Sequence, residues 1–399
     1  MSFTFELSPD LAEYGRAVRD WAVAEVRPHA RQADTAKRPP ENLRAILDTA
    51  PVPLGRLDVP DAEPFPKFEE GTWVTKLVWA EALAYGDIWV QPTMGGGLGH
   101  LPVASMGTSE QRRRWYEPAV AGGGLTLAFA LTEPGFGSDT SLVATTAVQD
   151  GDSWVLNGSK IYCTGGATAD FITVFATVDK SLGPRGISAF VVPQDTPGLV
   201  IVKRNEEKLG IRSWVTSALG FEDCRIPLEN RLGWDENGPA DDEDLAGGQS
   251  GALGALSQNR PTMSAMAIGI AQASLDTATE LLRERRAGFT VQRWSAIESE
   301  LARMNAVLER SRKVNLQAQW VADKAADDRL LPAIAKAYGP PNTERVIRRS
   351  MQLLGPEGQS TDLLLEKWYR DCKIMDIFEG SGQVQRLIVA RGLVGRAAG

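Results

Sequence analysis

The residue best suited to chemistry is Glu379, a carboxylate between Phe378 and Gly380, after an apolar stretch and just before an amphipathic helix. Desolvation in such surroundings raises the pKa of a carboxyl group toward the range useful for a general base. The structural alternative is an acidic residue at a helix start, where the helix dipole favours negative charge. The local sequence therefore makes Glu379 a candidate base and leaves the alternative open.

Histidine is scarce, with only His29 and His100 in 399 residues. This excludes a histidine-rich metal site, and a Ser-His-Asp or Cys-His mechanism would depend on a residue in no recognisable motif. We therefore expect no metal centre and a carboxylate for any acid–base work. The three cysteines, Cys163, Cys224 and Cys372, are widely spaced, so we expect plain thiols in a reducing, cytoplasmic setting.

A glycine-rich segment, LTEPGFGSD at residues 131–139, follows the strand-like run LTLAFA. Its glycines and hydroxyls would let backbone N–H groups approach a phosphate or a polar ring edge. It lacks the Gly-Lys-Ser/Thr of a P-loop, and no βαβ unit with a distal acid follows, as a Rossmann fingerprint requires. The segment therefore predicts either a ligand-binding loop or an ordinary turn.

A second segment, NGSKIYCTGG, covers residues 157–166. We expect an Asn-Gly turn that leads into a strand ending in Thr164 and paired glycines. Tyr162 and Thr164 are two residues apart, which places them on one side of a strand. They could present an aromatic ring and a hydroxyl to a planar ligand, or they could simply pack.

Three compositional zones must position these segments. Helical spacing of apolar residues runs from about residue 8 to 122, short β-rich runs divided by Gly, Asp and Pro follow, and long helical patterns return from about 250. No long helices separate the β runs, which favours an antiparallel sheet, and DGDSWVLNG is predicted to form one of its hairpins. The predicted fold class is α+β, with an N-terminal helical domain (1–122), a middle antiparallel β domain (123–235) and a C-terminal four-helix bundle (236–399).

The remaining bulk features narrow the functional class. Residues 234–251 are acidic and Gly-rich and are predicted to form a solvated loop. A net charge of −8 disfavours nucleic-acid binding. We expect no membrane span and no signal peptide, because no window offers roughly 18 uncharged apolar residues. The long C-terminal helices cannot easily be covered by this chain alone, which favours an oligomer.

These segments, in this order, resemble the acyl-CoA dehydrogenase family over nearly the whole chain. TEPGFGSD resembles the family's flavin-binding signature, LNGSKIYCTGG its companion on the next hairpin, and IFEGSGQVQRLIVAR its catalytic-base segment. GTSEQRRRWYEPAVAGG, KLGIRSWVTSALGFEDCRIP and YRDCKI are also similar to family stretches. The resemblance implies FAD as cofactor, an acyl-CoA thioester as substrate and α,β-dehydrogenation as the reaction.

By this resemblance, Glu379 matches the carboxylate that removes the α-proton, while the β-hydrogen leaves as hydride to flavin N5. The enolate-like oxygen needs preorganised donors, which the resemblance assigns to the backbone N–H of Glu379 and a ribityl hydroxyl of FAD. Some family members carry the base on a helix just before a motif Arg. Here that position is Asn259, before Arg260, and an amide cannot act as the base.

The resemblance also implies the contacts to cofactor and substrate. The positions that match FAD contacts are Phe129, Leu131, Thr132, Ser138, Tyr162, Thr164, Arg286, Gln352, Gly355, Ser381 and Gln383. The positions that match the substrate side are Ser138, Arg260, Phe378, Gly380 and Arg391. Tyr162 and Thr164 would supply the aromatic stack and the hydroxyl directed toward N5.

Two departures fall on the segments that, in the family, hold the FAD of a neighbouring subunit. Ser295 stands where a Gln is expected, and the family's paired glycines are Gly355-Pro356 here. We expect a homotetramer or homodimer, with a heteromeric dehydrogenase whose other subunit supplies half of the site as the alternative.

The expected electron acceptor is an electron-transferring flavoprotein. The competing function is a flavin oxidase or monooxygenase on the same fold. The retained Glu379 favours the dehydrogenase, because such relatives typically change or lose the base.

Overall fold

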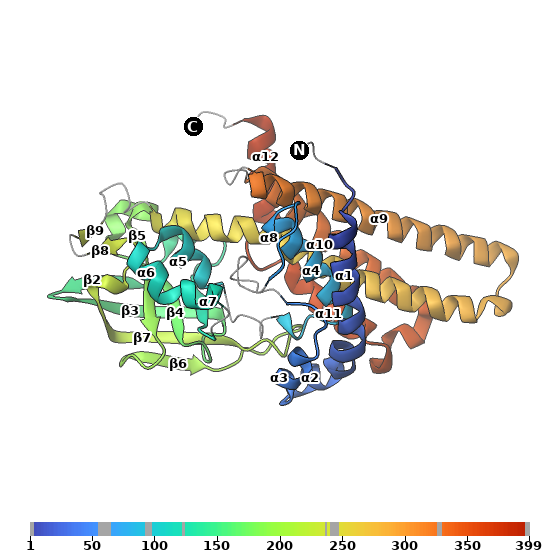
Figure 1. Cartoon of the computed structure of the whole chain (residues 1–399), viewed down its shortest axis with the longest axis horizontal. Coiled ribbons are helices and arrows are strands. Elements are labelled where there is room, and N and C mark those ends of the chain that lie inside the picture. The colour runs from blue at the N-terminus through green and yellow to red at the C-terminus, as the bar shows by residue number, and fades with distance from the viewer. Residues whose placement is uncertain are drawn as a thin grey trace.

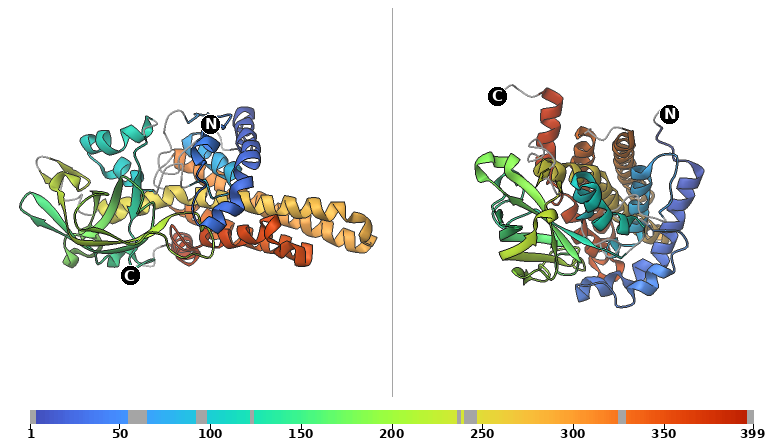
Figure 2. Two further views of the ribbon diagram at one scale, coloured as in Figure 1. Left: turned by 90° about the horizontal axis from the view of Figure 1, so that it is seen from below. Right: turned by 60° about the vertical axis from the view of Figure 1, so that its left-hand side comes forward.

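The computed structural model describes residues 4–54, 65–91, 98–121, 124–235, 238–239, 247–324 and 329–395. Helices, a β-sheet and a set of long helices follow one another along the chain (Figure 1). The sheet lies at one end of the molecule, and the long helices α8 (Gly247–Glu284) and α9 (Val291–Lys324) reach the opposite end (Figure 2). This arrangement confirms the predicted α+β fold class. The domain borders at residues 122 and 235 stay predictions.

The N-terminal part is helical, and one of its helices is largely buried. Its helices are α1 (Pro9–Trp21), α2 (Ala30–Ala36), α3 (Leu43–Asp48), α4 (Thr72–Gly86), α5 (His100–Met106), α6 (Ser109–Trp115) and α7 (Glu117–Val120). The start of α1 is set by the Ser8 hydroxyl, which accepts from the Leu11 N–H, and by Pro9 in the first turn. Helix α4 is apolar on nearly all sides because it packs between α1 and α8.

The middle part is one seven-stranded sheet. Its strands are β1 (Leu127–Ala130), β2 (Thr146–Asp150), β3 (Ser153–Thr164), β4 (Phe171–Thr177), β5 (Ile187–Pro193), β6 (Leu199–Lys203) and β7 (Thr216–Pro227). Most neighbours are antiparallel, as predicted, but β1 pairs with β4 in parallel, and β2 meets β4 in parallel at one residue pair. The antiparallel prediction therefore needs a correction at β4. The β2–β3 hairpin, rather than a helix, fills the connection from β1 to β4.

Two sequence-predicted turns have different outcomes. The hairpin between β2 and β3 is confirmed, because Asp150 pairs with Ser153 across a two-residue turn. The predicted Asn157-Gly158 turn is wrong, since both residues lie inside the continuous strand β3, at a register shift. Gly158 has φ +150°, and a Cβ there would lie 2.6 Å from the Thr145 hydroxyl. The glycine thus permits a bulge and a close approach, not a chain reversal.

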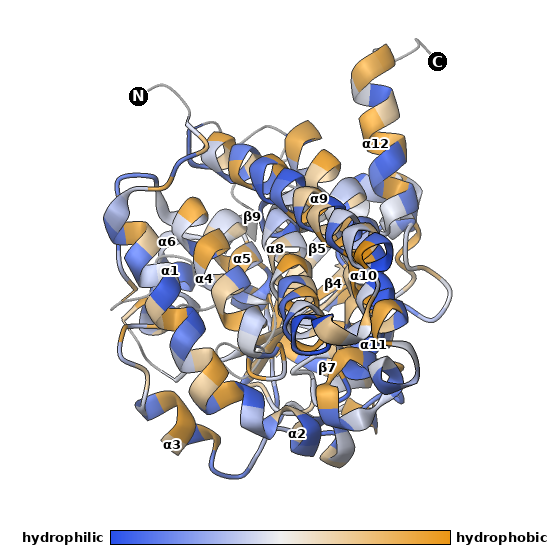
Figure 3. Ribbon diagram, turned by 90° about the vertical axis from the view of Figure 1, so that its right-hand side faces the viewer, coloured by the Kyte–Doolittle hydropathy of each residue, from blue (hydrophilic) through white to orange (hydrophobic). Residues whose placement is uncertain are grey.

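The C-terminal part adds four helices to α8. These are α9, α10 (Leu330–Leu354), α11 (Leu365–Met375) and α12 (Gly382–Val394). Helices α9, α10 and α11 pack against α8, and α12 packs against α10. Helix α10 is central, in contact with α8, α9, α11 and α12. Helix α12 projects away from the other helices (Figure 3) and leaves Leu387, Leu393 and Val394 more than half exposed.

The predicted acidic loop at 234–251 is shorter than expected. The short strands β8 (Trp234–Asp235) and β9 (Gly238–Pro239) form a small ladder at its start, and α8 begins at Gly247. Residues 236–237 and 240–246 lie outside the described residues. In the described part of the chain, no helix is long and apolar enough to cross a membrane.

A buried charge network ties the three parts together. Lys367 on α11 lies 2.8 Å from both Asp87 oxygens, after α4, and 2.6 Å from Asp371 Oδ2. Trp368 Nε1 also donates to Asp87, and the Ile211 N–H of the middle part donates to Asp371 at 2.5 Å. Burial alone would lower the pKa of Lys367, but Asp371 and Asp87 outweigh it and raise that pKa. Lys367 therefore keeps its charge, although burial raises the pKa of the Asp371 carboxyl group. The network fixes α11, which leads directly to Glu379.

Lys367→Met is expected to reduce the free energy of unfolding by about 3–5 kcal/mol, because it leaves two buried carboxylates without their shared cation. Lys373→Met is the control, since it removes the partly exposed ion pair with Glu344 and should cost about 0–1 kcal/mol. Denaturant titration of both variants measures the two changes. Equal losses would contradict the network's role.

Candidate active site

Glu379 lies in a tight loop between α11 and α12. Its φ is +55° and that of Gly380 is +90°, so the backbone enters the left-handed region at a non-glycine residue. The Gln385 side chain donates to the Gly380 carbonyl at 3.2 Å, and a Cβ on Gly380 would lie 2.4 Å from that amide nitrogen. Ser381 caps α12 by accepting from the Val384 N–H. Such strain, held by surrounding contacts, is a feature of functional sites.

The Glu379 side chain has one satisfied and one free oxygen. Asn259 Nδ2 donates to Oε1 at 2.9 Å, and Oε2 is buried with no hydrogen-bond donor among the described residues. The Arg260 guanidinium, itself buried, donates from Nε to the Glu379 backbone carbonyl at 3.0 Å. One carboxylate oxygen is therefore anchored while the other is left to accept a proton.

Burial raises the pKa of Glu379 to about 7. The ammonium of Lys336 on α10 is the largest influence that opposes this rise, followed by the hydrogen bond from Asn259. Lys76 on α4 and Arg260 on α8 lower the pKa of Glu379 further. A carboxylate poised near neutrality can take up a proton and release it again, as a general base must.

The glycine-rich segment at 131–139 is tied to β3 by a buried ion pair. Lys160 Nζ lies 2.7 Å from Glu133 Oε1 and also donates to the Leu131 carbonyl at 2.9 Å. Glu133 accepts in addition from the backbone N–H groups of residues 144 and 145. These contacts fix the loop between β1 and β2. Sequence analysis did not single out Glu133 or Lys160, although an acidic residue in a Gly-rich loop is a weak signal.

The predicted cofactor residues of the middle part lie on β1, this loop and β3. Phe129 and Thr132 are half-buried, Leu131 is buried and Ser138 is exposed. Tyr162 sits at a register shift in β3 with φ +57°, and its ring is 61% exposed, whereas Thr164 is half-buried. An exposed aromatic ring on strained backbone has no packing role of its own, so the ring is available to a planar ligand.

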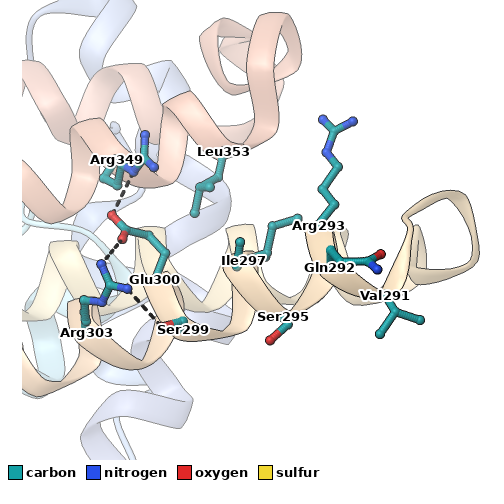
Figure 4. Close-up of a pocket in the computed structure, with 11 residues that line it drawn as sticks. Val291, Gln292, Arg293, Ser295, Ile297, Ser299, Glu300, Arg303, Arg349 and Leu353 are labelled. Carbon is teal, nitrogen blue, oxygen red and sulfur yellow. Dashed lines mark hydrogen bonds and ion pairs between the residues drawn. The ribbon is translucent and has the colours of Figure 1, made fainter.

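The predicted cofactor residues Arg286, Gln352 and Gly355 lie apart from the others, at the far end of the long helices. Beside them is an open cavity of about 880 Å³ between α9 and α10, whose wall includes Ser295 (Figure 4). Its other lining residues include Arg293, Glu300, Arg303 and Arg349. Three arginines against one glutamate make this cavity basic, as an anion site requires.

The remaining predicted positions fall into two groups, those around Glu379 and those exposed on α12. Arg260, Phe378 and Gly380 lie around Glu379, and Ser381 starts α12. Gln383 and Arg391 are exposed on α12. The structure therefore brings Arg260, Phe378 and Gly380 to Glu379 and leaves Arg391 on the outer helix.

Sequence reasoning missed Asn259 and Lys336 as neighbours of Glu379. In the sequence Asn259 marks only a position that carries no carboxylate, yet its side chain hydrogen-bonds the Glu379 carboxylate. Lys336 gave one weak signal, a single charge within the apolar run LLPAIAKAYG. In the described part of the chain, no cluster of His, Cys, Asp and Glu could hold a metal ion.

Comparison with known proteins identifies the class. The sequence matches the acyl-CoA dehydrogenase N-terminal domain at residues 8–123, the middle domain at 128–224 and the C-terminal domain at 246–394. The mitochondrial short-chain specific acyl-CoA dehydrogenase of Mus musculus is 35% identical over 382 residues, which cover 94% of this chain and 88% of that protein. A probable acyl-CoA dehydrogenase of Mycobacterium tuberculosis is 32% identical over 98% of this chain and 97% of its own.

The structure of butyryl-CoA dehydrogenase from Megasphaera elsdenii superimposes with a TM-score of 0.86 at 29% identity, over 99% of this chain and 100% of that one. The chain belongs to the acyl-CoA dehydrogenase family. Members of this family are FAD-dependent oxidoreductases that act on CH–CH groups, and this enzyme is one of them.

Glu379→Gln is expected to stabilise the protein at alkaline pH. Because folding raises the pKa of this carboxyl group to about 7, the wild-type chain loses stability as pH rises from the ordinary carboxyl pKa through about 7. The variant lacks this loss and should be more stable by about 1–3 kcal/mol above neutrality, with a smaller difference in acid.

Denaturant unfolding at acidic and alkaline pH measures the difference. Glu344→Gln, which removes a carboxylate on α10 that pairs with Lys373 rather than with the Glu379 site, is the control for the loss of a carboxylate charge. A Glu379→Gln difference that is constant across pH would contradict the raised pKa.

Proposed function

We propose that this enzyme catalyses the α,β-dehydrogenation of an acyl-CoA thioester, with Glu379 as the base that takes the α-proton. The observation that carries the proposal is the state of its carboxylate: buried, anchored through Oε1 by Asn259, free at Oε2, and raised in pKa to about 7. A thioester α-proton is only weakly acidic, so a base already ordered and free of strong hydrogen bonds lowers the cost of its removal.

Stabilisation of the developing thioester oxyanion falls to the backbone. Arg260 holds the Glu379 carbonyl, and the Glu379 N–H donates to no acceptor among the described residues. That N–H is therefore available as an oxyanion donor. Bound FAD would supply the acceptor for the β-hydride.

Two groups of residues support the cofactor site. The flavin end of the cofactor would be held by residues of the middle part, together with two residues that follow Glu379. The middle-part residues are Phe129, Leu131, Thr132, Ser138, Tyr162 and Thr164, and the two that follow Glu379 are Ser381 and Gln383. Arg286, Gln352 and Gly355 are too remote along the helices to complete the same site, and the basic cavity beside them suits the nucleotide end of a cofactor bound to a second subunit.

An oligomer follows from this division of the site, and we favour a homotetramer or homodimer over a heteromer. The exposed apolar residues of α12 support burial against another subunit. An electron-transferring flavoprotein is the proposed acceptor, and a structure described as the electron transferring flavoprotein of Acidaminococcus fermentans matches this chain at a TM-score of 0.85 and 30% identity. Three free buried cysteines support a reducing compartment such as the cytoplasm.

The proposed substrate is a short acyl-CoA. Its candidate contacts on the protein are Ser138, Arg260, Phe378, Gly380 and Arg391. Similarity to the mouse short-chain enzyme and to butyryl-CoA dehydrogenase supports this chain length. Butyryl-CoA is accordingly the substrate for the first tests.

Glu379→Gln is expected to retain bound flavin and to slow butyryl-CoA-dependent bleaching of the flavin absorbance by about 10²–10⁴-fold, because the base is gone. Stopped-flow absorbance under anaerobic single-turnover conditions measures the rate. Glu344→Gln should bleach like wild type. Unchanged bleaching in Glu379→Gln would place the base elsewhere, and rapid oxygen consumption by wild type would favour the oxidase.

Arg286→Ala is expected to weaken FAD binding by about 10–100-fold, because a cation near a cofactor phosphate is removed. Arg310→Ala, at an exposed position on α9, is the control. Titration of the apoprotein with FAD measures affinity, and native mass spectrometry counts FAD per chain. One FAD per chain in a homo-oligomer supports the proposal, whereas half that number, or full binding by Arg286→Ala, contradicts it.

A further inference from the structure

Lys336 is a fully buried lysine on α10 beside the loop that carries Glu379. Its Nζ has no hydrogen-bond acceptor among the described residues. The ammonium lies 5.7 Å from the centroid of the Phe378 ring, within the range of a cation–π contact. Phe378 immediately precedes Glu379, so this contact places the Lys336 charge beside the site.

The backbone of α10 is held firmly at this point. Gly339, one turn after Lys336, packs so closely on Ser264 of α8 that a Cβ would lie 1.9 Å from the Ser264 hydroxyl. That hydroxyl donates to the Ala335 carbonyl at 3.4 Å. Helix α8 also supplies Asn259 and Arg260 to Glu379. The lysine and the carboxylate are therefore positioned by the same helix pair.

A buried ammonium without a hydrogen bond needs another source of stabilisation. The carboxylates that act on Lys336 are Glu379 and Asp376, and Arg260 opposes them. Burial lowers the pKa of Lys336 to about 8 despite these two carboxylates. The lysine thus retains its charge near neutrality through the carboxylates that flank Phe378.

The other cations that face Glu379 are already engaged. Arg260 on α8 donates to the Glu379 carbonyl and to Ser257. Lys76 on α4 lies 4.6 Å above the Trp73 ring and influences Glu379 less than Lys336 does. Asn259 contributes a neutral hydrogen bond. Lys336 is therefore the cation best placed to favour the ionised carboxylate.

We infer that Lys336 is a positioning residue for the proposed reaction, whose ammonium keeps the Glu379 carboxylate ionised and ready to take the α-proton. The inference rests on the proposed role of Glu379 as base. In the step itself the α C–H bond breaks, an O–H bond forms at Glu379 Oε2, and the electron pair stays on the thioester as its enolate-like form. Lys336 keeps its own protons. Lys336 touches neither substrate nor cofactor in this role and acts only through Glu379.

The test replaces the charge and follows the pH profile. Lys336→Met and Lys336→Gln remove the ammonium, Lys336→Arg retains a cation, and Lys373→Met removes an exposed lysine near the same loop as a control. The measurement is the single-turnover rate of flavin bleaching by butyryl-CoA across pH. Both neutral variants should raise the apparent pKa of bleaching by about 1–3 units, while the rate at high pH approaches wild type.

Lys336→Arg should keep the apparent pKa close to wild type, as should Lys373→Met. A purely structural role would instead lower the rate equally at every pH and leave the apparent pKa in place. That result with either neutral variant overturns the inference.

A second readout does not depend on turnover. The difference in unfolding free energy between Glu379→Gln and its parent grows from the ordinary carboxyl pKa upward, and the pH at which it stops growing reports the ionisation of Glu379 in the folded chain. In the Lys336→Met background this upper pH should move upward by about 1–3 units. An unmoved upper pH overturns the inference. If instead Glu379→Gln retains bleaching, the proposal that Glu379 is the base is wrong. The comparison of unfolding free energies among the parent, the two single variants and the double variant still decides whether Lys336 acts on Glu379.

Discussion

The buried contacts of Lys367 with Asp87 and Asp371 are the interaction on which the rest of the structure depends. They join the end of α4 to α11, and Asp371 extends the join to the Ile211 N–H of the middle part. All three regions of the chain therefore meet at one charged cluster that water does not reach. Such a cluster adds little net stability compared with apolar packing, but it tolerates only one arrangement of its members. It thereby fixes α11, the helix that precedes the loop with Glu379.

The site uses that rigidity to hold an unfavourable arrangement. Glu379 adopts a left-handed conformation, has an unsatisfied buried oxygen and carries a raised pKa. Each of these features costs stability. Under the proposed function each also serves proton abstraction, since a well-solvated and fully hydrogen-bonded carboxylate would be a weaker and less directed base. The surrounding cations of α4, α8 and α10 limit the rise in pKa so that the carboxylate still ionises near neutrality.

The length of α8 and α9 has a functional consequence as well. These helices carry Arg286 and the basic cavity away from the sheet that presents Tyr162 and the glycine-rich loop. Under the proposed function these two groups of residues serve the cofactors of two different subunits. The exposed Leu387, Leu393 and Val394 of α12 are then available for contact with another chain.

Much of this protein is determined by its sequence alone. Apolar spacing of three and four residues specifies long helices, and alternating runs between Gly and Asp specify strands, because each period places apolar side chains on one face. The DG turn and the order of the motifs needed no coordinates, and neither did the choice of Glu379 as candidate base. Sequence reasoning failed at Asn157-Gly158, because the same dipeptide occurs in turns and in bulges. The close packing of Thr145 against Gly158, which distinguishes the bulge from a turn, is visible only in the structure.

Only the tertiary structure decided what surrounds Glu379. Asn259 is 120 residues from Glu379 in the chain, and Lys336 lies on another helix again, so no local pattern connects them. The influence of Asn259 and Lys336 on the Glu379 carboxylate depends on distance and burial. Both are set by the packing of the helices and cannot be seen from the spacing of residues in the sequence. The same holds for the pKa of Glu379. Its apolar neighbours in the sequence suggested a rise, but the size of that rise is a balance between desolvation and cations contributed by three separate helices.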